Sequence, residues 1–374
     1  KSVAVKLVVE KEREIEQFKS YPYFKISAVF DVKNAQGKMV ALKAESSVRY
    51  ETEEEAQAFL DKCQAANFTI GKVDVKPRKR KPAAPFTTST LQQEASRKLG
   101  FSVSRTMSVA QKLYEAGKIS YMRTDSLNLS QEAINGAVNE ITSAYGQDFV
   151  QTRKFKTKSQ SAQEAHEAIR PTSFADHRAG ADYSQQRLYE LIWKRAIASQ
   201  MADARLEKTV ATIAISGNDK TLVAQGEIIT FEGFLKVYIE SSDDEDSGDE
   251  VKGMLPPLSI GQGLPLNNMV AKEGFSRHAA RYTEASLVKK LEEMGIGRPS
   301  TYAPTISTIQ KREYVLKENR DGVDRNYQEL TLKNGNVATV TRTEVTGAEK
   351  SKLFPTNIAM VVNDFLVSHF PNVI

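Results

Sequence analysis

Hydrophobic and polar positions follow two different periods along the chain, and the dominant period changes several times. In residues 2–18 the apolar side chains fall near one stripe at helical spacing, with charged residues on the other side, so we predict a helix. In residues 23–32 apolar and polar positions alternate, which indicates a strand with one buried face. Similar patterns predict further strands at 39–50, 68–75, 209–215, 221–229 and 235–239.

Helical spacing dominates from about residue 87 to residue 200 and returns near the end of the chain. It predicts helices at 53–64, 89–99, 107–116, 188–201, 283–294 and 301–312. Thr283 is suited to cap the helix that follows it, and the last two helices, joined by a tight turn, form a helix-turn-helix. The strand-bearing parts, 23–86 and 207–272, are separated by a helical insertion. We therefore predict a multidomain α+β protein.

The composition is that of an ordinary globular protein and excludes several classes. The chain has 374 residues, 26% of them charged and 40% hydrophobic, which allows two to four domains at roughly 100–200 residues each. No apolar run approaches the ~18 residues that span a bilayer, and the start of the chain lacks a signal-peptide cleavage site, so we expect no membrane partner. The single cysteine, Cys63, cannot form an internal disulfide, which favours a reduced cytosolic setting.

The net charge of +5 conceals an uneven distribution. Residues 242–250 hold six acids, and without them the surplus rises to +11, which suggests a polyanionic partner. We interpret this acidic run as a flexible insertion. Residues 76–82 form a basic segment with prolines at both ends, which is either a solvated loop or a phosphate-facing strand or linker.

Common nucleotide-binding and hydrolase motifs are absent from the sequence. There is no Gly-x-x-x-x-Gly-Lys-[Ser/Thr] and no Gly-x-Gly-x-x-Gly, so no ATP or dinucleotide loop is predicted. Gly-x-Ser-x-Gly and His-Glu-x-x-His are also missing. With four histidines and one cysteine in all, a metal cluster of His and Cys is not expected.

A dense polar cluster follows the helix stop at Gly117. Tyr121, Arg123 and Asp125 lie within five residues of one another. Tyrosine can act as a covalent nucleophile, although its phenol, with an ordinary pKa of about 10, is mostly protonated at neutral pH. The guanidinium of Arg123 could favour the phenolate and neutralise a phosphate oxygen. The alternative is a turn with a half-buried tyrosine and an ion pair between Arg123 and Asp125.

A second cluster contains His166 and Arg170. Because the two are four residues apart, on a helix they share one face, and both could reach a phosphate. The alternative is a helix end stopped by Pro171 with a surface histidine.

A third cluster is the glycine-rich turn at 295–302. Backbone amides of such a turn and of a helix N-terminus attract phosphate, and Arg298, Ser300 and Thr301 add donors there. Arg312 adds charge further along the second helix. The alternative is a plain helix-turn-helix with capping residues.

Taken together, these segments resemble the bacterial DNA topoisomerase I family, type IA. The stretches that carry the resemblance occur in the family's order: 85–92, 119–126, 165–172 and 284–302. The resemblance implies a toroid whose hole is large enough for DNA. It also implies a β-rich arch domain (21–85 plus 207–272), a helical domain carrying the catalytic tyrosine (86–206) and a helical DNA-groove domain (1–20 plus 273–374).

The family's mechanism is a transient break in one DNA strand. The resemblance implies that Tyr121 forms a 5′-phosphotyrosine and releases a free 3′-hydroxyl, that another strand passes through, and that the break is resealed. Negative supercoils are relaxed without ATP, in agreement with the missing ATP loop. Arg123 would position the scissile phosphate. The resemblance assigns DNA contacts to His166, Gln111, Arg298, Ser300, Thr301 and Arg312, and spacing adds Arg170.

The sequence also departs from the family pattern. Type IA enzymes begin with a Toprim domain, whose Asp-x-Asp-x-Glu acids bind Mg²⁺, and end in zinc ribbons; neither is found here. We therefore expect a central fragment of a longer bacterial enzyme, cytoplasmic and nucleoid-associated, which binds no metal itself and is inactive without its Toprim domain. Its expected partners are that domain and single-stranded or negatively supercoiled DNA. The alternative is a non-catalytic module that binds single-stranded DNA and forms a gate.

Overall fold

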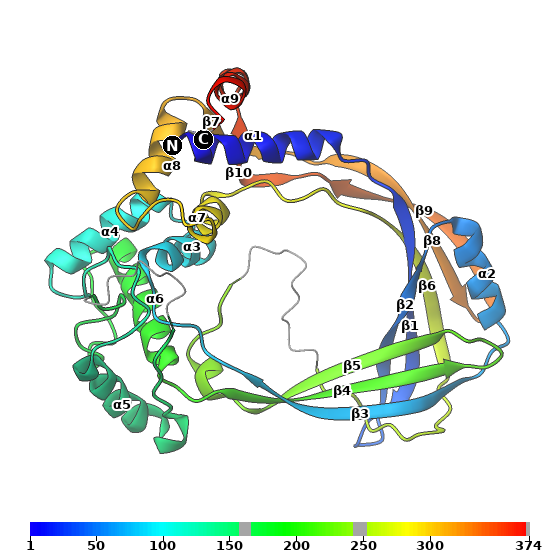
Figure 1. Cartoon of the computed structure of the whole chain (residues 1–374). Helices are drawn as coiled ribbons and strands as arrows, with labels where there is room; N and C mark the ends of the chain where they lie inside the picture. The colour runs from blue at the N-terminus through cyan, green and yellow to red at the C-terminus, as the bar shows by residue number, and fades with distance from the viewer. Residues whose placement is uncertain (157–165, 242–252, 372–374) are drawn as a thin grey trace.

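The chain traces a ring in the computed structural model, with helices on one side and a curved sheet on the other (Figure 1). The structure describes residues 1–156, 166–241 and 253–371, so the acidic run at 242–250 lies outside the described residues. The helices are α1 Ser2–Gln17, α2 Glu53–Cys63, α3 Thr88–Leu99, α4 Val103–Glu115, α5 Gln131–Tyr145, α6 Tyr183–Ser199, α7 Glu284–Glu293, α8 Tyr302–Lys311 and α9 Asn357–His369, with short 3₁₀ turns η1 Gln147–Phe149 and η2 Gly233–Lys236. The strands are β1 Pro22–Lys33, β2 Met39–Tyr50, β3 Phe68–Arg80, β4 Ala204–Ile215, β5 Thr221–Phe231, β6 Leu266–Phe275, β7 Val315–Arg320, β8 Val323–Lys333, β9 Asn336–Thr346 and β10 Glu349–Pro355.

Eight strands form one antiparallel sheet in the order β3-β4-β5-β2-β1-β6-β8-β9. Its buried face follows the alternation predicted from sequence. Phe24, Ile26 and Phe30 of β1 are buried, and they belong to one apolar core with Phe59 and Leu60 of α2. Figure 1 shows α2 on the outer side of this sheet, away from the centre of the ring.

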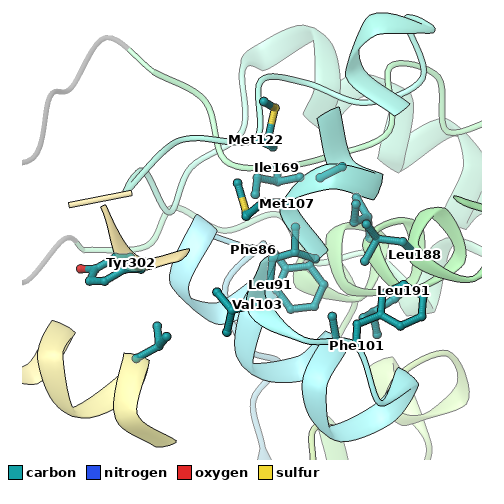
Figure 2. Close-up of a cluster of buried hydrophobic side chains, with 14 of the residues drawn as sticks. Phe86, Leu91, Phe101, Val103, Met107, Met122, Ile169, Leu188, Leu191 and Tyr302 are labelled. Atoms are coloured by element: carbon teal, nitrogen blue, oxygen red, sulfur yellow. The ribbon is translucent and has the colours of Figure 1, made fainter. Parts of the chain in front are cut away.

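A second core joins the helices, and it is separate from the core of the sheet. Phe86, Leu91 and Met107 gather there between α3 and α4, together with Leu188 of α6 (Figure 2). The two central helices begin at matching caps: Thr87 caps α3 and Thr283 caps α7, each in a capping box with the residue three positions later. These caps fix the first residues of α3 and α7, the two helices that meet nearest residues 119–126.

Strand β4 contributes to both cores, but with opposite faces. Ala204 and Leu206 are buried in the helical core, and Ala211 and Ile213 are buried in the sheet core. Because side chains alternate along a strand, these pairs point to opposite sides. Residues 207–210 between them are exposed or half-buried, so the strand passes from one core to the other through a stretch that neither core covers.

The α+β class is confirmed, but three sequence predictions need correction or completion. Residues 235–239 were predicted as a strand and instead form the end of the 3₁₀ turn η2 and the residues after it, because Phe234 and Tyr238, four positions apart, both enter the helical core. Residues 273–374 were expected to be helical, yet β7 to β10 occupy much of this range. The basic segment at 76–82 continues β3 as far as Arg80, so most of it is a strand and not a loop, and contact with phosphate stays a prediction.

Candidate active site

The segment that carries Tyr121 is an extended stretch held from its inner side by α3. The backbone N–H of Thr88 donates to the carbonyl oxygen of Thr124 (2.9 Å). The hydroxyl of Thr88 donates to the carbonyl oxygen of Met122 (2.6 Å) and accepts from the N–H of Thr124 (2.9 Å). Met122 and Thr124 are buried, so the backbone on both sides of Arg123 is fixed.

The other side of the same segment is held by residues 168–171. The N–H of Ser120 donates to the carbonyl oxygen of Arg170 (2.9 Å), and its hydroxyl bonds to the backbone of Ala168 and Arg170 (2.9 Å each). Ile119 pairs with Pro171 in an isolated antiparallel bridge. The expectation that His166 and Arg170 share a helix face is therefore wrong, because residues 168–171 lie extended between the 119–120 backbone and Phe86.

Tyr121 itself points out of this framework. Its side chain is 44% exposed, although Ile119 and Met122 on either side are buried. Its ring meets Tyr114 of α4 edge-on, with ring centroids 5.2 Å apart and an interplanar angle of 67°. Such edge-to-face contacts restrict ring orientation while leaving the hydroxyl accessible. A nucleophilic phenol needs this combination of accessibility and fixed orientation.

Arg123 and Ser300 line one small cavity between α4 and α8. The cavity has a volume of about 210 Å³ and is also lined by Ser104, Met107 and Ser307. The hydroxyls of Ser104 and Ser307 hydrogen-bond to each other and so connect the two helices. The structure thus places the first and third polar clusters of the sequence side by side.

The turn before α8 is closed by Thr301. Its hydroxyl accepts from the N–H of Arg298 (2.8 Å), and its own N–H donates to the carbonyl oxygen of Arg298 (2.9 Å). Gly297 adopts a positive φ of 87°, and a Cβ there would lie 2.9 Å from the ring of Tyr302. The tight turn leaves the side chain of Arg298 exposed at the N-terminus of α8, where the helix dipole also favours an anion.

A cluster of acids lies where α7 meets α3. The hydroxyl of Ser89 donates to the carboxylate of Glu292 (2.6 Å). The surrounding protein raises the pKa of Glu292 by desolvating its carboxylate, and the charges of Glu293 and Asp125 raise it further. Burial raises the pKa of Tyr302 to about 12, and the charge of Glu292 contributes. The repulsion from Asp125 indicates that this acidic cluster is close to the tyrosine segment.

Arg170 is engaged with protein groups rather than directed to solvent. Its Nε and Nη2 donate to the two carboxylate oxygens of Glu167 (3.0 Å each), and its Nη1 donates to the carbonyl oxygens of Pro171 and Thr172 (3.1 and 3.2 Å). Burial would raise the pKa of Glu167, but hydrogen bonds from Arg170 and Ser130 hold it below its usual value. His166 is exposed at the edge of the described residues.

Gln111 and Arg312 are not among the residues that line the cavity of Arg123 and Ser300. Gln111 is on α4, one turn before Tyr114, and its amide donates to Glu115 (2.7 Å). Arg312 follows the last residue of α8 and lines a separate cavity of about 180 Å³ with Lys1 and other residues. The ten residues of α8, about 15 Å of helix, lie between Arg312 and the turn that contains Arg298.

The sequence alone did not identify several residues that build this site. Thr88 and Ser89 lie in the stretch 85–92, but nothing in their spacing indicates contacts with residues 122–124 or with Glu292. Nothing in the sequence around Tyr114 indicates its contact with Tyr121. Thr88 and Ser89 act through contacts with residues distant in sequence, whereas the partner of Tyr114 is only seven residues later.

The described residues do not provide a metal site. In the ranges that the structure covers, no three His, Cys, Asp or Glu side chains gather as metal ligands would. We therefore derive no step through a metal held by these residues. Of the helices described, none is long and apolar enough to cross a membrane.

Comparisons with known proteins agree on one family. A family model described as DNA topoisomerase matches residues 1–325. A "DNA topoisomerase 1 type prokaryotic" of Acanthamoeba polyphaga mimivirus is 39% identical over 99% of this chain and 48% of its own length. The "DNA topoisomerase 1" of Zymomonas mobilis is 43% identical over 85% of this chain and 27% of its own length.

A solved structure shares the fold over the whole chain. Full-length topoisomerase I from Thermotoga maritima matches with a TM-score of 0.77 and 32% identity, over 100% of this chain and 55% of that one. The chain thus spans less than half the length of these two curated relatives and about half of the solved structure.

Proposed function

Because the chain belongs to the bacterial type IA DNA topoisomerase family, we propose that Tyr121 is the nucleophile that breaks a phosphodiester in single-stranded DNA. One observation carries this assignment within the structure. Tyr121 is exposed on a backbone that Thr88 and Ser120 fix on both sides, and Arg123, two residues later, shares a cavity with Ser300.

The proposed step exchanges one phosphate ester for another. The phenol oxygen of Tyr121 bonds to phosphorus while the bond from phosphorus to the 3′-oxygen breaks. The phenol loses its proton and the departing 3′-oxygen gains one, which leaves a 5′-phosphotyrosine and a free 3′-hydroxyl. Because the ester bond is retained, religation by the reverse step needs no ATP. Arg123 neutralises charge that develops on the phosphoryl oxygens.

The remaining predicted residues would hold the strand that leads to the break. Arg298, Ser300 and Thr301 offer a cation, a hydroxyl and a helix N-terminus beside the Arg123 cavity. Arg312, beyond the roughly 15 Å of helix α8, would extend this contact along the strand. Gln111 and His166 are proposed to contact DNA nearer Tyr121. Arg170, whose donors are bonded to protein, would act by holding the tyrosine segment.

Full activity requires groups that the described residues do not supply. We propose that a Toprim domain of the same parent chain provides the acids that bind Mg²⁺, and that the intact bacterial enzyme relaxes negatively supercoiled DNA in the cytoplasm, at the nucleoid. The support for this is the resemblance and the family comparison.

The test uses the intact parent enzyme, Mg²⁺ and a single-stranded oligonucleotide labelled at either its 5′ or its 3′ end. We expect a covalent protein–DNA adduct that retains the 3′ label, and no adduct with Tyr121→Phe, which keeps its DNA affinity. Tyr183→Phe, at an exposed tyrosine of α6, is the matched control and should form the adduct normally. An adduct in the Tyr121→Phe enzyme would disprove the assignment.

The alternative for this chain in isolation is a non-catalytic module that binds single-stranded DNA. The chain alone would then bind a single strand with a steep salt dependence and form no adduct. Binding without an adduct in the intact enzyme as well would extend this alternative to the parent.

A further inference from the structure

The eight-stranded sheet has two edge strands, β3 and β9, and β3 is protected against pairing with a further strand. Near its start the outer side is already paired, because the N–H of Ile70 donates to the carbonyl oxygen of Gln262 (3.0 Å). Farther along, β3 carries Lys76, Pro77 and Lys79. Lysines and prolines on an edge strand prevent another strand from adding to it. This edge of the sheet is therefore closed.

Strand β9, at the opposite edge, has none of these protections (Figure 1). It pairs with β8 over eleven residues without a register shift, it contains neither lysine nor proline, and none of its residues is buried. Seven of the eleven are threonine or valine, which favour strands. Within the described ranges, no backbone hydrogen bond joins its outer side to another segment. Its free N–H and C=O groups are therefore open to a further strand.

The two charged residues of β9 have opposite signs and lie on one face of the strand. Arg342 and Glu344 are two positions apart, with Thr343 between them on the other face. Nε of Arg342 donates to Glu329 (3.1 Å), and Glu344 accepts from Nη2 of Arg325 (2.8 Å). Both charges are thus held in place beside the free edge. The family model ends at residue 325, so membership of the family does not explain this edge.

A second copy of β9 fits the edge in one antiparallel register. A two-fold axis perpendicular to the sheet keeps every side chain on its own face, so the axis must pass through a residue. An axis through Arg342 or Glu344 places like charges opposite each other, which destabilises a sheet. An axis through Thr343 places Arg342 of each copy opposite Glu344 of the other. Glu344 then lies between two arginines, Arg325 of its own hairpin and Arg342 of the second copy.

We propose that β9 is a self-association surface, on which two copies of this chain join their sheets edge to edge about a two-fold axis through Thr343. The same register places Val340 and Val345, which are 45% and 68% exposed, opposite Thr346 and Thr341 of the second copy. These β-branched pairs are favourable across antiparallel strands. Because the contact uses the free edge of both copies, association stops at a dimer. The proposal does not depend on the chemistry at Tyr121.

The first test is disulfide formation between two copies, without DNA. In the Thr343→Cys chain the two thiols face each other across the axis, at a Cα separation of about 4.5–5.5 Å, which a disulfide can span. The matched control is Thr341→Cys. Both threonines are exposed and bond to a side chain of β8, but the two copies of position 341 are about 13 Å apart along the strand. Cys63 is buried and does not compete.

In a glutathione redox buffer we expect the Thr343→Cys chain to form a linked dimer on a non-reducing gel and the Thr341→Cys chain to remain monomeric. Equal linkage in the two chains, or no linkage at position 343, would overturn the proposal.

The second test reverses one charge at a time and measures self-association by sedimentation equilibrium. Arg342→Glu and Glu344→Arg should each weaken the dimer at least about tenfold, because two symmetry-related pairs become repulsive. An equimolar mixture of the two variants should form a mixed dimer, since every acid then faces an arginine. Lys38→Glu, at an exposed lysine between β1 and β2, makes the same change of charge as Arg342→Glu and should dimerise normally.

The mixture separates loss of the interface from loss of the fold, because unfolded variants would not restore each other, and thermal unfolding of each variant verifies the fold directly. An unsubstituted chain that remains monomeric at its highest soluble concentration would overturn the proposal. A mixture that associates no better than the single variants would overturn the register through Thr343.

Discussion

At the scale of single residues, the guanidinium of Arg170 is bonded to protein groups of the 167–172 stretch. It forms a two-bond contact with Glu167 and also donates to Pro171 and Thr172. Lysine keeps the charge but cannot reproduce the planar fork. A substitution of Arg170 by lysine therefore distinguishes a role in DNA binding from a role in holding the 168–171 backbone.

We predict that Arg170→Lys lowers the free energy of unfolding by about 1–3 kcal/mol, because hydrogen bonds to a partly buried carboxylate are lost. Its affinity for a single-stranded oligonucleotide, measured well below the unfolding transition, should change less than about twofold, because lysine keeps the charge. A tenfold change in affinity would require a difference of about 1.4 kcal/mol in binding free energy. Urea unfolding and fluorescence anisotropy measure the two quantities. Arg178→Lys, at an exposed arginine, is the control. A large loss of affinity with unchanged stability would restore Arg170 as a DNA contact.

Glu94 of α3 is the second residue with a clear energetic role. Its carboxylate is 1% exposed and accepts from the hydroxyls of Tyr238 (2.6 Å) and Ser241 (2.5 Å), with Lys98 at 3.3 Å. Burial alone would raise the pKa of Glu94, but these partners hold it below its usual value of 4.5. A lowered pKa means stability that is present above pH 4.5 and is lost as the pH falls below it.

We predict that Glu94→Gln costs about 3 kcal/mol of unfolding free energy at neutral pH, because it leaves buried donors and a cation without their partner. The difference from the unsubstituted chain should shrink as the pH is lowered through 4.5. Denaturant unfolding at several pH values measures it, with Glu190→Gln on the exposed side of α6 as control. A difference that is constant with pH would contradict the ionised state of Glu94.

At the scale of elements, the N-terminus of α3 and the tyrosine segment depend on one hydroxyl. Thr88 bonds to Met122 and Thr124, which lie more than thirty positions away in sequence. Thr88→Val keeps the shape and removes the three hydrogen bonds of the hydroxyl, and it leaves the N–H of Thr124 buried without its partner. We predict a loss of about 1–3 kcal/mol in stability and a slower formation of the Tyr121 adduct in the intact enzyme. Thr90→Val, on the same helix, tests whether loss of the cap alone explains the effect.

The sequence predicted most helices of the ring and the sheet strands β1 to β5, because burial imposes a period on these elements, but it assigned no strand to β6. It did not predict β7 to β10. Strand β9 is exposed along most of its length, so backbone pairing with β8 forms it without any apolar alternation. Helix α5 was missed as well, since its buried positions are mainly alanine and isoleucine among polar residues.

The candidate site was predicted in part for the same reason. Local motifs marked Tyr121, Arg123 and the turn at 297–301, whereas Thr88, Ser89 and Glu292 depend on contacts that no local spacing records. The pairing of Arg170 with Glu167, three residues apart, could have been predicted from the sequence. The extended backbone that makes this pairing possible could not.

At the scale of the whole molecule, two separate cores suggest two separate unfolding units. Trp193, the single tryptophan, is buried in the helical core, and Cys63, the single cysteine, is buried in the sheet core. Burial raises the pKa of the Cys63 thiol to about 11, so in the folded chain it should resist thiol reagents at mildly alkaline pH. The two residues therefore report on different parts of the ring.

We predict that Trp193 fluorescence and Cys63 labelling follow different midpoints in urea, because β4 changes its buried face between the cores and residues 207–210 belong to neither. Both probes are native, so no substitution is required. Coincident midpoints would show that the strands between the cores transmit unfolding from one to the other and that the ring is a single cooperative unit.

The contact between α3 and α7 has a topological consequence. The backbone reaches the helices α3 to α6 and the helices α7 to α9 only by way of the sheet, so the two helical groups meet through side chains such as Ser89 with Glu292 and Ser104 with Ser307. The ring is therefore closed by non-covalent contacts between the two helical groups and not by the backbone. Under the proposed function, a circular DNA would be able to thread onto this ring, or leave it, without any cut in either polymer. The strength of the contacts between the two helical groups would then set how long the DNA and the protein remain linked.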